Sequence, residues 1–138
     1  MTEHAALDSR FRLVPDARFA AEEELSELLR DDDFRIWIVE DANNHHAAGY
    51  LLAHLHWGHP FFEPREVIFI RDVFIHTSFR GQGLGRALLE QVHVWAQKRG
   101  ISQIELGVLA QNTTALAFWE AVQAKPFSVF YTLEVKNA

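Results

Sequence analysis

A segment with three alternating glycines most constrains how this chain can fold. Residues 80–86 read Arg-Gly-Gln-Gly-Leu-Gly-Arg, shortly after the apolar run 67–75 and directly before the helical pattern of residues 87–99. Glycine lacks the Cβ atom that would keep a phosphate away from the backbone, and the start of a helix offers unpaired N–H groups with a partial positive charge. The segment therefore predicts a strand, loop and helix that bind an anionic ligand, with a pyrophosphate as the first hypothesis.

The spacing of these glycines separates the kinds of phosphate-binding loop. A Walker A loop does not fit, because no Gly-Lys-Ser/Thr is present in the segment. A dinucleotide-binding loop requires Gly-x-Gly-x-x-Gly, whereas Gly81, Gly83 and Gly85 place the last glycine one residue early. Glu105 nevertheless lies about twenty residues further on, where such domains hold a ribose. A dinucleotide-binding domain therefore stays open as an alternative.

A third glycine pattern fits without adjustment. It reads Arg/Gln-x-x-Gly-x-Gly/Ala, which Arg80, Gly83 and Gly85 satisfy, and the aliphatic residues Val73 and Ile75 precede it in the apolar run. This segment resembles the acetyl-coenzyme A loop of the GNAT N-acetyltransferases.

A second motif strengthens the resemblance. The strand-like run 103–109 leads into Asn112 and a helical stretch that ends in Phe118-Trp119, similar to the Asn and helix ending in Phe-Tyr of that family. The similarity extends over about residues 36–133. Within the family, the order of Phe61-Phe62, Asp72 and residues 79–81 looks closest to the polyamine (diamine) acetyltransferase branch.

The resemblance implies a cosubstrate, a reaction and a set of contacts. The cosubstrate is acetyl-CoA, and its acetyl group passes to the primary amine of a small, polyamine-like acceptor. Direct attack by the amine is expected, since the chain has no cysteine nucleophile. The implied cofactor contacts comprise the end of a strand, the glycine loop with its flanking arginines, and two residues of the second motif: Val73, Phe74, Ile75, Arg80, Gly81, Gln82, Gly83, Leu84, Gly85, Arg86, Asn112 and Phe118.

The proton-transfer residues depart from the family pattern. Trp119 stands where the family has its general-acid tyrosine, and an indole N–H cannot supply that proton. Arg71 replaces the glutamate of the polyamine branch, and an arginine is no base at neutral pH. We therefore expect Asp72 as the base and Tyr131 as a substitute acid. Further candidates for relaying the amine proton are Glu66, His54, His56 and His76.

These departures leave a catalytically impaired acyl-CoA-binding module open as another alternative. A metal site is not expected, because His54 and His56 share a strand face but have no nearby carboxylate or cysteine in the sequence to complete a tetrahedral set.

The order of patterns predicts an α/β (α+β) fold with a mixed, mostly antiparallel central sheet flanked by helices. The expected helices are residues 16–30, 87–99 and 113–122, and the expected strands are 34–39, 49–57, 66–76, 103–109 and 127–135. Compared with the family, the N-terminal unit looks abbreviated, with only residues 11–14 and one clear helix before residue 34. A sheet edge left open in this way predicts a homodimer.

Composition agrees with a single enzyme domain over residues 1–138, because 138 residues with 49% hydrophobic content can bury one sizeable core. The absence of cysteine and of a long apolar run predicts a cytoplasmic protein without a membrane partner. The net charge of −6 argues against nucleic-acid binding and suits a cationic substrate.

Overall fold

The computed structural model describes residues 8–15, 17, 33–57 and 65–136. They belong to two compact units, Met1–Gly107 and Val108–Ala138. The expected helix over residues 16–30 lies outside the described residues apart from Ala17, as do Phe61 and Phe62. A single domain over residues 1–138 stays a prediction.

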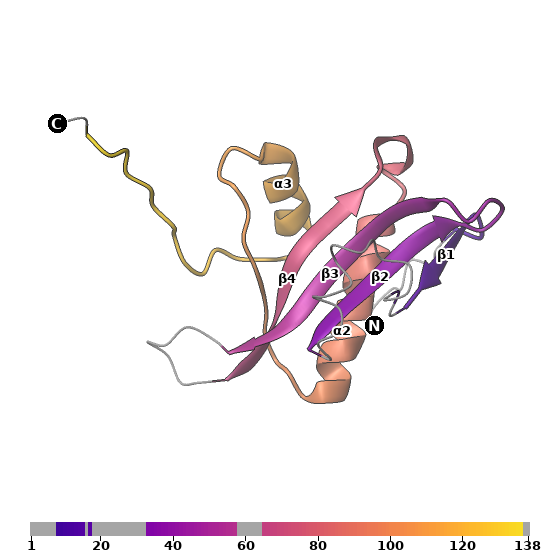
Figure 1. The fold of residues 1–138 in the computed structure, drawn as a ribbon, viewed down its shortest axis with the longest axis horizontal. Coiled ribbons are helices and arrows are strands. Elements are labelled where there is room, and N and C mark those ends of the chain that lie inside the picture. The colour runs from indigo at the N-terminus through magenta and orange to yellow at the C-terminus, as the bar shows by residue number, and fades with distance from the viewer. Residues whose placement is uncertain (1–7, 16, 18–32, 58–64, 137–138) are drawn as a thin grey trace. The chain divides into compact units, whose positions relative to one another are not determined.

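The first unit is built on a five-stranded sheet in the order β1-β2-β3-β4-β5 (Figure 1). Strands β1 to β4 pair antiparallel, and β4 pairs parallel with β5. The mixed, mostly antiparallel sheet is thus confirmed. A dinucleotide-binding domain requires a mostly parallel sheet, so that alternative does not fit. The strands are β1 Phe11–Val14, β2 Phe34–Asp41, β3 Ala47–Trp57, β4 Glu66–Ile75 and β5 Ile104–Leu106.

Helix α2, Leu84–Arg99, covers one face of this sheet (Figure 1). Its buried residues recur every three or four positions, as expected for a helix with one apolar stripe. They are Leu84, Leu88, Leu89, Val92 and Ala96. The ring of Trp95 lies 5.7 Å from that of Trp37 on β2. The helix starts three residues earlier than the sequence predicted, and it ends as expected at Gly100, whose φ of 72° is left-handed.

The opposite face of the sheet carries a smaller apolar cluster. Ile36 and Leu52 are cross-strand partners, and together with Ala17 they are almost fully buried. The half-buried side chains of Val14, Phe34 and Ile38 pack against them. Because strand side chains alternate between faces, β2 contributes Ile36 to this cluster and its neighbour Trp37 to the α2 side.

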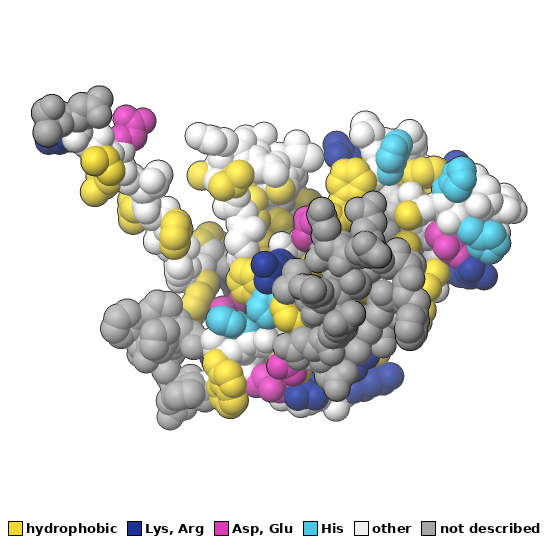
Figure 2. Space-filling model, in the orientation of Figure 1, with side chains coloured by type: hydrophobic (Ala, Val, Ile, Leu, Met, Phe, Trp, Pro, Cys, Tyr) yellow, Lys and Arg dark blue, Asp and Glu magenta, His cyan; other side chains and the backbone are white. Residues whose placement is uncertain are grey.

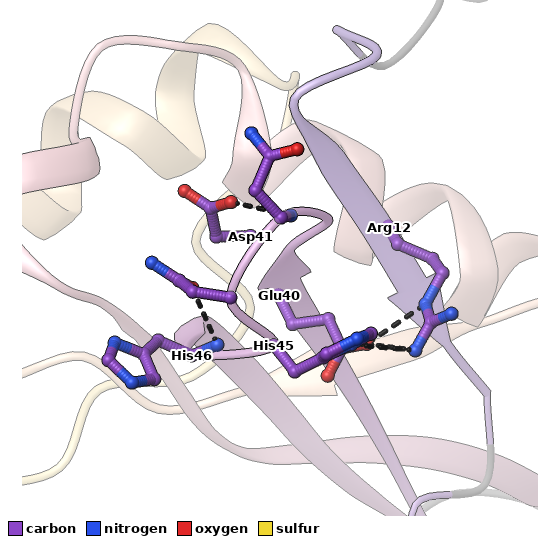
Figure 3. Close-up of polar contacts among 7 residues, drawn as sticks. Arg12, Glu40, Asp41, His45 and His46 are labelled. Carbon is purple, nitrogen blue, oxygen red and sulfur yellow. Dashed lines mark hydrogen bonds and ion pairs between the residues drawn. The ribbon is translucent and has the colours of Figure 1, made fainter.

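A network of polar contacts closes the turn between β2 and β3 (Figure 3). Glu40 forms an ion pair with Arg12 of β1, and its Oε1 lies 3.2 Å from Nδ1 of His45. The contact with His45 and the Arg12 guanidinium hold the pKa of Glu40 below its ordinary value, although burial acts in the opposite direction. Asp41 accepts a hydrogen bond from the backbone N–H of Asn43 at 2.9 Å. The turn thereby fastens β1 to the central hairpin.

The second unit contains α3, Thr113–Ala121, which confirms the predicted helix there. The predicted strand over residues 127–135 is wrong: no strand forms within these residues, although the segment runs extended (Figure 1). Its apolar side chains are exposed, up to 99% for Phe130. Figure 2 shows hydrophobic side chains along this segment. An alternating pattern indicates a two-faced strand, but it does not specify the neighbour that a strand requires.

Among the described residues, no helix has the length and apolar character needed to cross a bilayer.

The close approach of β3 and β4 at Gly49 can be tested by substitution. A Cβ at Gly49 would lie 2.6 Å from the carbonyl oxygen of Phe74 and 2.6 Å from Cδ1 of Ile75. We expect Gly49→Ala to lower the free energy of unfolding by about 1–3 kcal/mol, because a backbone oxygen cannot rotate away. Gly107→Ala is the matched control, since a Cβ there meets nothing within 4 Å. Equal stability of the two variants in urea denaturation would contradict this packing.

Candidate functional site

The second half of β4 has one free edge. Strand β5 pairs with β4 only at Ile68, Phe69 and Ile70, whereas β3 pairs along β4 as far as Ile75. Backbone groups of residues 71–75 that point away from β3 therefore have no strand partner within residues 65–107. Such groups can bind the amides of an extended ligand.

A β-bulge lies where this free edge begins. Leu52 pairs with Asp72 and Ala53 pairs with Ile70, so Arg71 is an extra residue on β4. The extra residue shifts the alternation of side chains by one position. Without it, Arg71 would lie on the face that Leu52 and Tyr50 share, and Asp72 would lie on the α2 side. The bulge instead places Asp72 on the face opposite α2, where it is exposed.

The glycine loop follows β4 after the short 3-10 helix η3, Thr77–Phe79. Gly81 and Gly83 have φ angles of 79° and 77°, a left-handed conformation that favours glycine. A Cβ on either would meet nothing within 4 Å, so the loop backbone is open on that side. Gly83 is the N-cap of α2, and the first bond inside the helix runs from Ala87 N–H to Gly83 C=O at 3.1 Å.

The first turn of α2 therefore presents amides to a ligand. The N–H groups of Leu84 and Gly85 precede the first bond inside the helix, Arg86 follows them in the same turn, and the helix dipole adds partial positive charge. Leu84 as a whole is only 2% exposed, so its side chain belongs to the core and does not reach a ligand. Together with Gly81, Gln82 and Gly83, these residues form a continuous stretch of backbone suited to a diphosphate.

The base of the glycine loop is held by Arg80 of the loop itself and by Arg10 and Phe11, which lie just before and at the start of β1. Nε of Arg80 donates to the carbonyl of Ile75 at 3.2 Å. The ring of Phe79 packs edge-to-face on Phe11 of β1 at 5.6 Å. The guanidinium of Arg10 lies over both rings, at 5.1 Å and 5.4 Å from their centroids. The loop is thus supported by the opposite edge of the sheet as well as by β4.

Tyr50 is a residue of this site that the sequence interpretation missed. It lies on β3 opposite Phe74, and its hydroxyl donates a hydrogen bond to Oδ2 of Asp72 at 2.6 Å. This bond, with burial and the nearby charge of Asp72, raises the pKa of Tyr50 to about 12. The pair could not be predicted, because it depends on the register of β3 against β4 and on the bulge.

The other candidate side chains have structural partners. His54 stacks on Phe34 with ring centroids 4.9 Å apart, and it also contacts His56 and Phe69. Oε1 of Glu66 accepts a hydrogen bond from Arg99 at 3.0 Å, and Nδ1 of His76 accepts one from Ser78 N–H at 3.2 Å. Within the part of the chain that the structure describes, no group of three His, Cys, Asp or Glu side chains is placed to hold a metal ion.

Three predicted site residues belong to the second unit. Asn112 is the N-cap of α3, and its Oδ1 accepts a hydrogen bond from Ala115 N–H at 3.0 Å. Phe118 packs edge-to-face on Trp119 at 5.0 Å. Tyr131 lies in the extended C-terminal segment and is 84% exposed. The functional roles of these residues stay predictions.

Relatives with assigned names are acetyltransferases. The chain is 28% identical over 99 residues to the L-ornithine N5-acetyltransferase NATA1 of Arabidopsis thaliana, a match that covers 72% of this chain and 42% of that protein. It is 33% identical over 58 residues to the thialysine N-epsilon-acetyltransferase of Bos taurus, covering 42% and 34% of the two chains. The chain therefore spans less than half the length of these curated relatives.

The fold is similar to that of a solved acetyltransferase. The aminoglycoside N-acetyltransferase AAC(6')-Iy, solved with the bisubstrate analogue CoA-S-monomethyl-acetylneamine, superposes with a TM-score of 0.71 at 17% identity, covering 92% of this chain and 100% of that one. The sequence profile of the Acetyltransferase (GNAT) family matches residues 2–123. The free edge of β4, the glycine loop and the N-terminus of α2 agree with this match. Because the match extends over most of the chain, the protein belongs to the GNAT acetyltransferase family.

Proposed function

We propose that the protein transfers the acetyl group of acetyl-CoA to the primary amine of a small, cationic acceptor. The observation that carries this proposal is the junction of three features: the free edge of β4, the open glycine loop, and the start of α2, where the N-cap Gly83 provides no side-chain hydrogen bond. The edge suits the amides of a pantetheine arm, and the loop suits a diphosphate. The two lie at opposite ends of one short stretch of chain, residues 73–86.

The roles of the residues follow from the chemistry of acyl transfer. The acceptor amine must lose a proton before it attacks, and Asp72 takes that proton directly or through water. Backbone N–H groups near Val73, Phe74 and Ile75 stabilise the negative charge that develops on the thioester oxygen. The C–N bond forms as the C–S bond breaks, and Tyr131 supplies the proton for the departing thiolate. Asn112 and Phe118 hold the pantetheine arm.

A small acceptor with a terminal amine is supported by the relatives and by charge. The names of two relatives place the acetyl group on N5 of L-ornithine and on the N-epsilon of thialysine, which are side-chain amines of small cationic amino acids. A net charge of −6 attracts acceptors of this kind. A polyamine-like acceptor belongs to the same chemical class.

A homodimer is also proposed, on the basis of the C-terminal segment. Residues 128–135 are extended and expose large apolar side chains, among them Val129, Phe130 and Leu133. Apolar extended segments are suited to pairing with a strand of another copy. A cytoplasmic location and the absence of nucleic-acid and membrane partners remain predictions.

The proposed reaction can be tested by following CoA release with a panel of amines. We expect turnover with diamines, polyamines or ornithine-like amino acids, and none with amides of the same size, which lack a nucleophilic amine. The alternative, an acyl-CoA-binding module, is favoured by Arg71 and Trp119 at the positions of the family's base and acid. Tight binding of acetyl-CoA without turnover on any amine would support that alternative.

The glycine loop can be tested with two substitutions at opposite ends of α2. Gly83 and Gly100 have φ angles of 77° and 72°, and a Cβ on either would meet nothing within 4 Å. Alanine should therefore cost each variant a similar stability, about 1 kcal/mol. We expect only Gly83→Ala to weaken CoA binding, by about tenfold or more in calorimetry, because it distorts the amides of the loop. Equal affinities in the two variants would rule out the loop as the diphosphate site.

The two proton-transfer assignments can be tested in the same assay. We expect Asp72→Asn and Tyr131→Phe each to lower kcat by at least about tenfold, or about 1.4 kcal/mol of barrier, while the affinity for CoA is retained. Glu90→Gln, which removes a carboxylate from the middle of α2, is the control and should leave kcat unchanged. A variant that keeps the full rate shows that its residue has been assigned wrongly.

A further inference from the structure

Asp72 is the only carboxylate of the described free half of β4, and one of its oxygens already has a partner. The Tyr50 hydroxyl lies 2.6 Å from Oδ2, a short distance typical of an O–H donor and a charged acceptor. The Tyr50 ring also contacts the ring of its cross-strand partner Phe74, with the centroids 6.0 Å apart. Asp72 is therefore held from β3 at a defined orientation.

The direction of this hydrogen bond does not change over the pH range in which enzymes work. The pKa of Tyr50 is raised to about 12, first by the bond to Asp72 and then by burial and the nearby carboxylate charge. The phenol accordingly remains protonated and remains a donor. Its proton is already engaged by Oδ2 of Asp72, so we do not assign Tyr50 as a replacement for the acid that Trp119 lacks.

The bulge and the tyrosine act on the same side chain. The extra residue Arg71 puts Asp72 on the face of Tyr50. The hydroxyl of Tyr50 then engages Oδ2, which leaves Oδ1 for another donor. A carboxylate with one oxygen held and the other open is well suited to accept a proton from an amine that approaches from a fixed direction.

We propose that Tyr50 is a positioning residue for the acetyl transfer: it fixes Asp72 so that the open oxygen Oδ1 meets the acceptor amine. This inference rests on the proposed function, because it assigns Tyr50 a role in that reaction. Neither the glycine loop nor the resemblance to the family points to Tyr50, which is a feature of this chain's own β3.

A double-mutant cycle tests the proposal. Tyr50→Phe keeps the ring and removes only the hydroxyl, and it should lower kcat by about tenfold while leaving the affinity for CoA unchanged. In an Asp72→Asn background the same substitution should have no further effect on kcat, because Tyr50 acts through the carboxylate. A loss of the same factor in both backgrounds, or no loss in the wild type, would overturn the proposal.

A second measurement tests the hydrogen bond without activity. The chain has two tyrosines, so Tyr131→Phe leaves Tyr50 as the single phenol. Its absorbance near 295 nm should titrate with a midpoint of about 12, and Asp72→Asn in this background should lower the midpoint. A midpoint near the ordinary value of about 10 would show that Tyr50 does not hold Asp72. If no amine is acetylated, the proposed function fails, whereas this titration still decides the contact.

Discussion

The pairing of β3 with β4 is the interaction on which the rest of the site depends. This ladder brings Gly49 against the backbone of Phe74 and Ile75, and it contains the bulge at Arg71. The contact at Gly49 lies at the last residue of β4, Ile75, shortly before η3 and the glycine loop. The bulge at Arg71 decides which face of the sheet Asp72 occupies. A single strand pair thus positions both the backbone that suits a thioester carrier and the carboxylate that suits an amine.

Much of this arrangement could be predicted from local patterns. The hairpin of β2 and β3, the strand before the glycines, α2 with its Gly100 terminus and α3 all follow from periodicity and from residues that cap or break helices. The glycine loop was predictable from the spacing of Arg80, Gly83 and Gly85, although the helix after it was expected from residue 87 and not from Leu84. These features depend on residues that are close together in the sequence, so the sequence alone is enough to predict them.

The remaining features depend on partners that are distant in sequence. The Tyr50–Asp72 pair requires a register between strands and one extra residue, and a one-residue slip would have moved Asp72 to the other face. The C-terminal strand was expected from its alternating side chains, yet a strand also needs a neighbour to receive its hydrogen bonds. The sequence shows only that Arg71 replaces a glutamate of the polyamine branch, whereas the structure shows that Arg71 forms the bulge.

The exposed C-terminal segment has a consequence for the behaviour of the protein in solution. Residues 127–136 contain no proline, and Glu134 and Lys136 are their only charges. Short stretches of high β-propensity and low charge are prone to aggregate when nothing covers them. The solubility of this protein therefore depends on whether the segment is covered, and a charge introduced at the exposed Phe130 should reduce aggregation in concentrated samples.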